Sequence, residues 1–156
     1  MKNISKELKL TIELVPETSW GNNIRKCVSQ SNWDKIRKAA YAKYKYKCGI
    51  CEAPGRLSCH EIWDYDDELH LQNLNGFIAL CTMCHNIKHI GLSGILAQEG
   101  KLDFDKLIEH FKIVNGCNLK TYEKHYDDAF KKWNERSKHE WHINLGEFKD
   151  IIKKEM

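Results

Sequence analysis

Residues 48–89 read CGICEAPGRLSCHEIWDYDDELHLQNLNGFIALCTMCHNIKH and contain two Cys-x-x-Cys pairs, Cys48/Cys51 and Cys81/Cys84. The inner cysteines are separated by 29 residues. Each pair forms a tight knuckle that supplies two sulfurs, so four thiolates at this spacing suit a tetrahedral Zn²⁺. Because four cysteine ligands leave no open coordination position, we expect a structural zinc. The metal takes the place of the hydrophobic core that a region this short lacks.

Three histidines lie between and just after the cysteine pairs. His60 is at the end of an expected strand between the knuckles, and His85 and His89 are four residues apart. If the segment after Cys84 is helical, His85 and His89 share one helix face. We therefore expect the three imidazoles to converge beside the zinc, with His85 and His89 as a ligand pair. The alternative is that these two histidines cap or pack that helix.

The totals are those of a globular protein. The chain has 156 residues, 42% hydrophobic and 30% charged, and we expect residues 1–156 to form a single domain. No apolar run approaches the roughly 20 residues that span a bilayer. The N-terminus, MKNISKELKL, lacks the apolar core of a signal peptide, so we expect a cytoplasmic protein without a membrane partner. Seven cysteines in such a chain favour metal binding over disulfides. The net charge of +3 permits contact with a polyanion without requiring it.

Local patterns predict the elements around the cysteine pairs. Residues 7–15 alternate apolar and polar side chains, the period of a half-buried strand. Residues 33–46 predict a helix capped by Ser31 or Asn32, whose basic face either contacts phosphates or is simply solvated. Two short strands, residues 56–63 and 77–80, are expected on either side of an acidic and polar loop.

Beyond Gly91 the chain changes to helical patterns. A short helix is expected over residues 92–98, and a second over 104–114 with Asp103 as its N-cap and Gly116 as its C-terminal stop. Asn118 caps a third helix with an aromatic stripe, which predicts core packing rather than base stacking. The stripe comprises Tyr122, Tyr126, Ala129, Phe130 and Trp133.

Two further elements are expected near the C-terminus. Residues 141–145, WHINL, alternate like a strand and are placed to pair with residues 8–14, which would join the two ends of the chain. Residues 148–154 predict a final helix. The fold class expected from these patterns is α+β.

The order of motifs resembles the HNH nucleases, a family with a ββα-metal site. The resemblance covers residues 33–91, and its most specific part is the string CHEIWDYDD…GFIALCTMCHNIKH. It implies a treble-clef-like ββα-metal zinc module over residues 33–91 and leaves residues 92–156 as a helical extension outside the family pattern. The implied activity is metal-dependent hydrolysis of nucleic-acid phosphodiester bonds.

The resemblance also implies roles for individual residues. His60 matches the family's general base, which takes a proton from the attacking water. His85 and His89 match the ligands of a second, catalytic divalent ion such as Mg²⁺ or Mn²⁺, separate from the structural Zn²⁺. The implied partner is nucleic acid, DNA in particular, and a homodimer that cuts both strands is left open.

Two positions depart from the family pattern. Cys59 stands where the family places an Asp or His ligand, and a thiol is a poor ligand for Mg²⁺. Gly76 falls where the family's Asn would orient the base, so Asn73 or Asn75 would serve only if the loop shifts.

Neighbouring polar residues offer compensation for those departures. Glu61, directly after the base, would supply a carboxylate, and Lys88 would hold a phosphate, although an exposed lysine without a role is equally compatible with the sequence. The loop aspartates Asp64, Asp66 and Asp67 offer the same carboxylate, although a solvated loop is the favoured interpretation.

Three functions are compatible with these residues. The first is an active endonuclease with His60 as base. The second is a catalytically degenerate module with the same fold that binds nucleic acid, a nucleotide or a protein. The third is a pocket that binds or degrades a small nucleotide beneath the helical C-terminal half. The missing Asn favours the second function, whereas the three retained histidines favour the first.

Overall fold

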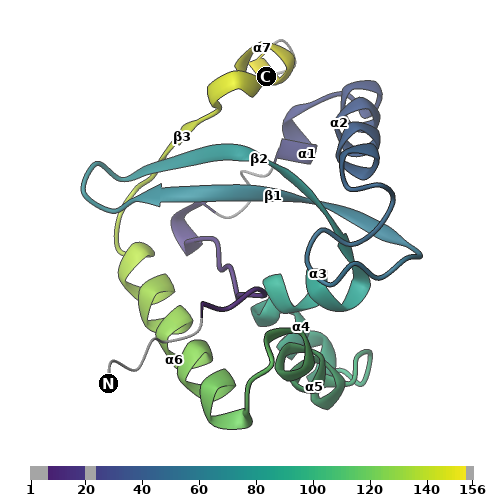
Figure 1. Ribbon diagram of the computed structural model, residues 1–156. Helices are drawn as coiled ribbons and strands as arrows, with labels where there is room; N and C mark the ends of the chain where they lie inside the picture. Colours follow the sequence, from purple (N-terminus) through teal and green to yellow (C-terminus); the bar gives the residue numbers. More distant parts are fainter. Residues whose placement is uncertain (1–6, 20–23, 154–156) are drawn as a thin grey trace, which may run out of the picture.

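The computed structural model describes residues 7–19 and 24–153, which form a mixed α+β fold around a three-stranded sheet (Figure 1). Strand β1 (Leu57–Asp66) pairs antiparallel with β2 (Leu71–Cys81). Strand β3 (His142–Asn144) runs parallel to the start of β2, so the strand order is β1-β2-β3 and β1 is an edge strand.

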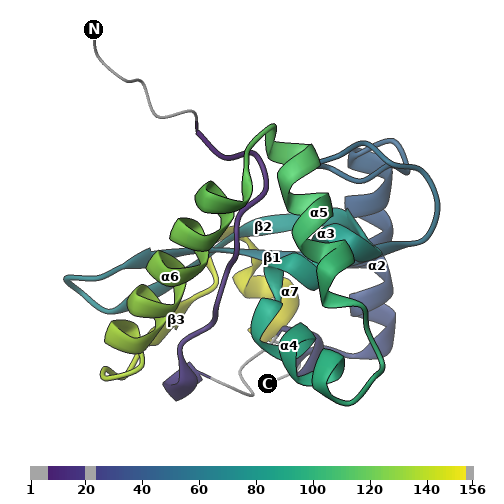
Figure 2. The ribbon, with the colours of Figure 1, turned by 90° about the horizontal axis from the view of Figure 1, so that it is seen from below.

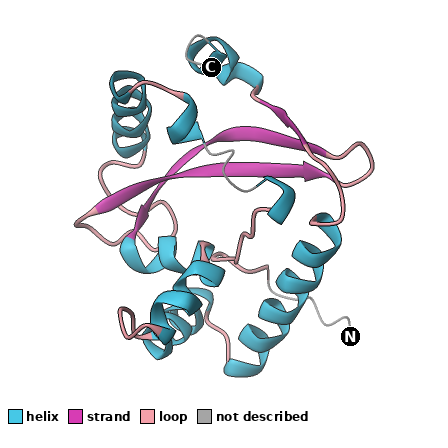
Figure 3. Ribbon diagram, turned by 180° about the vertical axis from the view of Figure 1, so that it is seen from behind, coloured by secondary structure: helices cyan, strands magenta, loops and turns pink. Residues whose placement is uncertain are grey.

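Helices cover both faces of the sheet (Figures 1 and 3). On one face lie α1 (Ile24–Cys27), α2 (Gln30–Lys43) and the C-terminal α7 (Lys149–Lys153). On the other lie α3 (Thr82–Lys88), α4 (Ile90–Gln98), α5 (Phe104–Asn115) and α6 (Leu119–Arg136). Two short 3₁₀ turns complete the described elements, η1 (Glu17–Ser19) and η2 (Gly146–Phe148). None of the helices in the described ranges is both long enough and apolar enough to cross a membrane.

The sheet separates two hydrophobic clusters. The first lies under the α3–α6 face and includes Leu10, Leu80, Ile87 and Phe111. The second lies under the α1, α2 and α7 face and includes Trp33, Phe77 and Ile152. Side chains of one strand reach both clusters because successive residues of a strand point to opposite faces.

The central hairpin is longer than the sequence patterns predict. The expected acidic loop is instead the continuation of both strands, which are joined by a tight turn over residues 67–70. The Asp66 carboxylate accepts hydrogen bonds from the backbone N–H groups of Glu68 and Leu69, and His70 takes a left-handed φ of 54°. The polar composition misled the prediction because an edge hairpin tolerates polar side chains on its solvated positions.

Helices α5 and α6 agree with their predictions. Asp103 caps α5 by accepting from the backbone of Asp105 and Lys106, and Gly116 ends this helix in the left-handed conformation. Asn118 caps α6. Four residues of the predicted α6 stripe are core: Tyr122 is buried, and Tyr126, Ala129 and Phe130 pack against the same cluster. Trp133 is half-buried and donates from Nε1 to the Val15 carbonyl.

Helices α2, α4 and α7 differ from the prediction at one or both ends: α2 ends at Lys43 rather than at Tyr46, and α4 begins at Ile90 rather than at residue 92. Helix α2 begins at Gln30 rather than near Trp33, because Ser29 and not Ser31 or Asn32 is its N-cap, accepting a hydrogen bond from Asn32 N–H. Near the C-terminus, α7 covers Lys149–Lys153 after the η2 turn. Residue 154 of the expected final helix lies outside the described residues.

The expected pairing of residues 8–14 with residues 141–145 is wrong. The segment 7–15 is extended but belongs to no sheet; we call it the N-terminal arm. Seen from below, the arm runs between α6 and the helices α3 and α5 (Figure 2). Its backbone is satisfied elsewhere: Leu10 N–H and C=O bond to the Asn115 side chain, and Ile12 N–H bonds to His125 Nε2. Residues 142–144 do form the predicted strand, but it pairs with β2.

Candidate metal centres and groove

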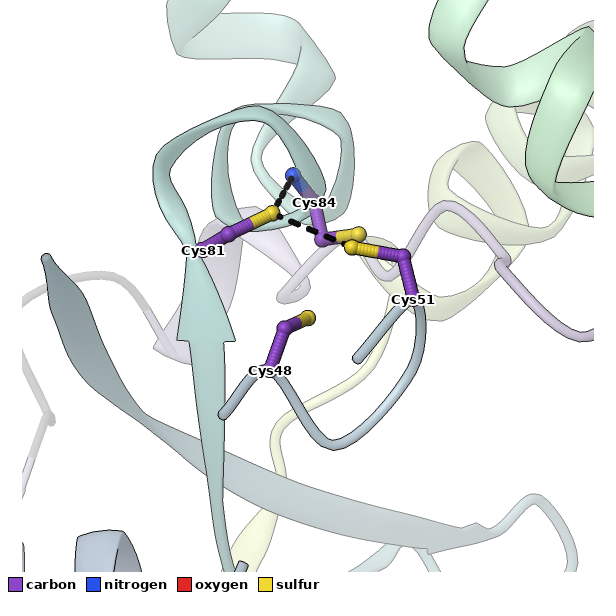
Figure 4. A group of neighbouring side chains, drawn as sticks. All are labelled: Cys48, Cys51, Cys81 and Cys84. Carbon is purple, nitrogen blue, oxygen red and sulfur yellow. Dashed lines mark hydrogen bonds between the residues drawn. The ribbon is translucent and has the colours of Figure 1, made fainter. Parts of the chain in front are cut away.

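The four knuckle cysteines converge on one point (Figure 4). Cys48 and Cys51 come from the loop after α2, Cys81 ends β2, and Cys84 lies in the first turn of α3. Their Sγ atoms all lie within 4.8 Å of one another, and the Cys51 and Cys81 sulfurs are 3.6 Å apart. Tetrahedral Zn–S bonds of about 2.3 Å imply S···S separations of about 3.8 Å, so this spacing fits a four-sulfur zinc site.

Backbone and neighbouring side chains support the sulfurs. Cys84 N–H points to Cys81 Sγ at 3.4 Å, and Ile50 N–H points to Cys48 Sγ at 3.5 Å. His110, on α5, places Nε2 3.3 Å from Cys84 Sγ. All seven cysteines are free thiols, so the expected preference for metal over disulfides is consistent with the fold. The cluster can hold a metal ion such as zinc.

The three predicted histidines also converge. His60 comes from β1, and His85 and His89 lie one helical turn apart at α3 and its C-terminal cap. Their ring centroids are separated by 5.6 Å for His60–His85, 5.0 Å for His60–His89 and 4.7 Å for His85–His89. One nitrogen from each ring lies within 4.8 Å of the other two, close enough for a common metal ion.

Burial keeps two of these imidazoles neutral. Burial, with a smaller contribution from the nearby His60, lowers the pKa of His85 to about 4. Burial likewise lowers the pKa of His89 to about 4, with His60 and His85 as additional causes. Both rings therefore keep a nitrogen lone pair at neutral pH, the form in which imidazole binds a metal.

Glu13, in the N-terminal arm, is part of this cluster although the sequence patterns did not identify it. Its Oε2 lies 2.9 Å from His60 Nε2, and its Oε1 lies 2.8 Å from Lys88 Nζ. Burial favours the neutral carboxyl, but the hydrogen bond from His60 and the attraction of Lys88 outweigh it and lower the pKa of Glu13 to about 2. The sequence feature that bears on Glu13 is the alternation of apolar and polar side chains in residues 7–15, which places Glu13 on the face opposite the apolar side chains of the arm.

Lys88 is buried, unlike either alternative expected from the sequence, a phosphate-binding lysine or an exposed lysine without a role. Only 5% of its surface is exposed, and Nζ donates to Thr11 Oγ1 at 3.1 Å as well as to Glu13. Its charge is directed into the protein, where it holds the N-terminal arm against α3, rather than outward toward a phosphate.

Cys59 and Glu61 lie on the opposite face of β1 from His60. Cys59 packs against the cluster under α2, and burial, with a contribution from Glu61, raises the pKa of its thiol to about 12. The Glu61 carboxylate accepts from Ile24 N–H and Trp63 Nε1–H, and burial raises its pKa. Neither side chain belongs to the histidine cluster, because adjacent residues of a strand alternate between faces.

A β-bulge explains the glycine at position 76. Ile62 pairs with Gly76 and Trp63 with Leu74, which leaves Asn75 as the extra, exposed residue of β2. Gly76 has a φ of 151°, where a side chain would be strained. Asn73 bonds to Asn144 of β3 instead of reaching the histidines.

A groove of about 1340 Å³ opens beside His60, His85 and His89 and follows the free edge of β1. Five basic side chains from both sides of the sheet edge line it: Arg25, Arg37, Arg56, Lys132 and Arg136. Two of these are ion-paired, Arg37 with Asp34 and Arg136 with Asp67. Three carboxylates also line the groove, of which Glu13 is paired with Lys88 and Glu61 is held by two donors. This leaves Arg25, Arg56 and Lys132 against Asp64. The basic excess favours a negatively charged occupant.

Comparison with family models, curated proteins and solved structures finds no match to this chain.

Proposed function

We propose that this chain is a metal-dependent endonuclease of the HNH type, in which β1, β2 and α3 form the ββα-metal module and the groove along β1 binds nucleic acid, DNA in particular. The observation that carries the proposal is the convergence of His60, His85 and His89 at the wall of a groove with five basic side chains. Clustered imidazoles with perturbed pKa values in a cleft are a common feature of catalytic sites.

The chemistry assigned to the chain's own residues is acid–base and electrostatic. His60 accepts a proton from the water that attacks the phosphodiester phosphorus. His85 and His89, neutral at pH 7, hold a divalent ion, which when bound offsets the negative charge of the phosphate and of the leaving oxygen. The basic groove side chains bind the flanking phosphates. The cysteine cluster holds Zn²⁺ and keeps α3 against the sheet.

The identity of the second ion follows from the donor set. The two proposed ligands, His85 and His89, are both imidazoles, and Cys59, in the place of the family's Asp or His ligand, faces away from them. Imidazole suits transition metals such as Zn²⁺ and Ni²⁺, whereas Mg²⁺ prefers oxygen ligands. Mn²⁺ also favours oxygen ligands but, as a transition metal, binds imidazole more readily than Mg²⁺ does. We therefore expect Mn²⁺ to support cleavage better than Mg²⁺.

A second function, nucleic-acid binding without cleavage, is favoured by the bulge at Gly76. The family's base-orienting Asn is replaced there by a glycine that the backbone conformation requires. In this case the groove still binds a polyanion, but no phosphodiester bond is broken.

A cleavage assay separates the two functions. Purified protein loaded with zinc should nick supercoiled plasmid in the presence of Mn²⁺, and His60→Ala should lower the rate by about 10²–10⁴-fold, the usual contribution of a general base. His142→Ala is the matched control, because His142 is an exposed histidine on β3.

Metal analysis of the same samples completes the test. The proposal expects two ion sites per chain and unchanged zinc content in His60→Ala. Binding of labelled DNA without cleavage of DNA or RNA under any divalent ion would establish the second function and overturn the first.

A further inference from the structure

The histidine cluster includes one residue from far outside the HNH-like region. Glu13 is 47 residues before His60 in sequence, yet its carboxylate bridges His60 Nε2 and Lys88 Nζ at 2.9 and 2.8 Å. His60 and Lys88 are both buried, whereas 39% of the Glu13 side chain is exposed, so the bridge joins two buried groups through a partly exposed carboxylate.

The bridge decides which ring nitrogen of His60 carries the proton. An ionised carboxylate can only accept hydrogen bonds, so the nitrogen that faces it must be the donor. His60 Nε2 therefore carries hydrogen, and in the neutral ring the lone pair is on Nδ1. A general base needs this lone pair free to take a proton.

The arm holds Glu13 in place by contacts on both sides of it in sequence. Glu13 N–H donates to Lys88 C=O at 3.2 Å, so its backbone and side chain are both tied to the same lysine. Leu10 is fixed by two hydrogen bonds to Asn115, and Ile12 by one to His125. The carboxylate is thus oriented before any substrate binds.

We propose that Glu13 is the positioning residue of His60, and that through it the N-terminal arm fixes the Nε2–H tautomer and leaves Nδ1 as the basic nitrogen. The kinetic consequence rests on the proposed nuclease function, whereas the tautomer does not. The N-terminal arm then orients a residue of the site, in addition to packing over the hydrophobic cluster.

The tautomer is read directly by long-range ¹H–¹⁵N NMR of the imidazole rings, in protein that retains cysteine-bound zinc and has no other divalent ion. Wild type should show His60 as the Nε2–H form at neutral pH. In Glu13→Gln the amide oxygen should face Lys88, because the lysine ammonium only donates hydrogen bonds. The amide NH₂ should then face His60. The ring must accept that hydrogen bond at Nε2, so His60 should shift to the Nδ1–H form.

Kinetics gives the second readout. Glu13→Gln should lower kcat by about 10–100-fold, the usual effect of removing a group that orients a reacting ligand. The KM for DNA should change by less than about twofold. Thr11→Val is the matched control, because the Thr11 hydroxyl accepts a hydrogen bond from Lys88, whereas His60 Nε2 bonds to Glu13. It should keep the Nε2–H tautomer.

Each outcome is decisive. A wild-type spectrum with His60 as the Nδ1–H form overturns the inference, and since this needs no variant it holds even if Glu13→Gln fails to fold. An unchanged tautomer and kcat in Glu13→Gln would also overturn it. The expected tautomers in a protein that cuts nothing would instead refute the nuclease function and leave the role of Glu13 in orienting His60 intact.

Discussion

The cysteine cluster and the histidine cluster both take residues from helix α3, but they are assembled in different ways. The cysteines come from two tight knuckles with sulfurs that already point at one another. The histidine cluster takes one ring from β1 and two from α3, and its orientation depends on Glu13 of the N-terminal arm. Each cysteine pair is therefore set by local chain geometry and the β1–β2 hairpin brings the two pairs together, whereas the histidine site also depends on packing of the N-terminal arm.

The largest effect is expected from removing a zinc ligand. Cys48→Ser should abolish zinc binding and leave the protein unfolded or aggregated, because structural zinc contributes on the order of 10 kcal/mol to folding. Circular dichroism and metal analysis measure this, with Cys27→Ser as a control outside the cluster. A soluble Cys48→Ser protein with no zinc and an unchanged melting temperature would show that the cysteine cluster is not structural.

The next largest effect concerns the arm. Asn115 is buried and makes both backbone hydrogen bonds of the buried Leu10. Asn115→Ala should destabilise the fold by several kcal/mol, because each buried polar group left unpaired costs about 1–3 kcal/mol. Urea unfolding gives the value, and exposed Asn134→Ala on α6 is the control. Equal stability of the two variants would mean that the arm is not held by Asn115.

A smaller effect is expected where α5 meets the cysteine cluster. His110 Nε2 lies 3.3 Å from Cys84 Sγ and can support the thiolate. His110→Ala should weaken zinc binding about 10–100-fold without unfolding the protein at saturating zinc. Competition with a chromophoric chelator measures the affinity, and the exposed neighbour Glu109→Ala is the control. A zinc affinity equal to that of wild type would show that His110 does not support the zinc site.

The smallest effect on stability is expected from the histidine pair. The double variant His85→Ala/His89→Ala should lose Mn²⁺ binding in calorimetry but keep its zinc and its fold, because the cysteine cluster and not the histidines anchors α3. The double variant His139→Ala/His142→Ala tests for non-specific effects of losing two histidines. Retained Mn²⁺ binding in the first variant would separate His85 and His89 from the metal site.

Much of the local structure was predictable from particular residues. Asp103, Gly116 and Asn118 fixed the ends of α5 and α6, because caps act within one helical turn. The arm was predicted wrongly as a strand: alternation reports which side chains are buried, but not whether a neighbouring strand or the Asn115 and His125 side chains satisfy the backbone.

The sequence by itself determined the two Cys-x-x-Cys knuckles and the helical spacing of His85 and His89, because each depends on contacts a few residues apart. The two knuckles, 30 residues apart, meet because the β1–β2 hairpin returns the chain to its start. Only the tertiary structure decided that Glu13 faces His60, that Lys88 points inward, and that Cys59 and Glu61 lie on the opposite face of β1. These relations depend on how the arm and the sheet pack. Packing sums many weak long-range contacts that no short stretch of sequence encodes.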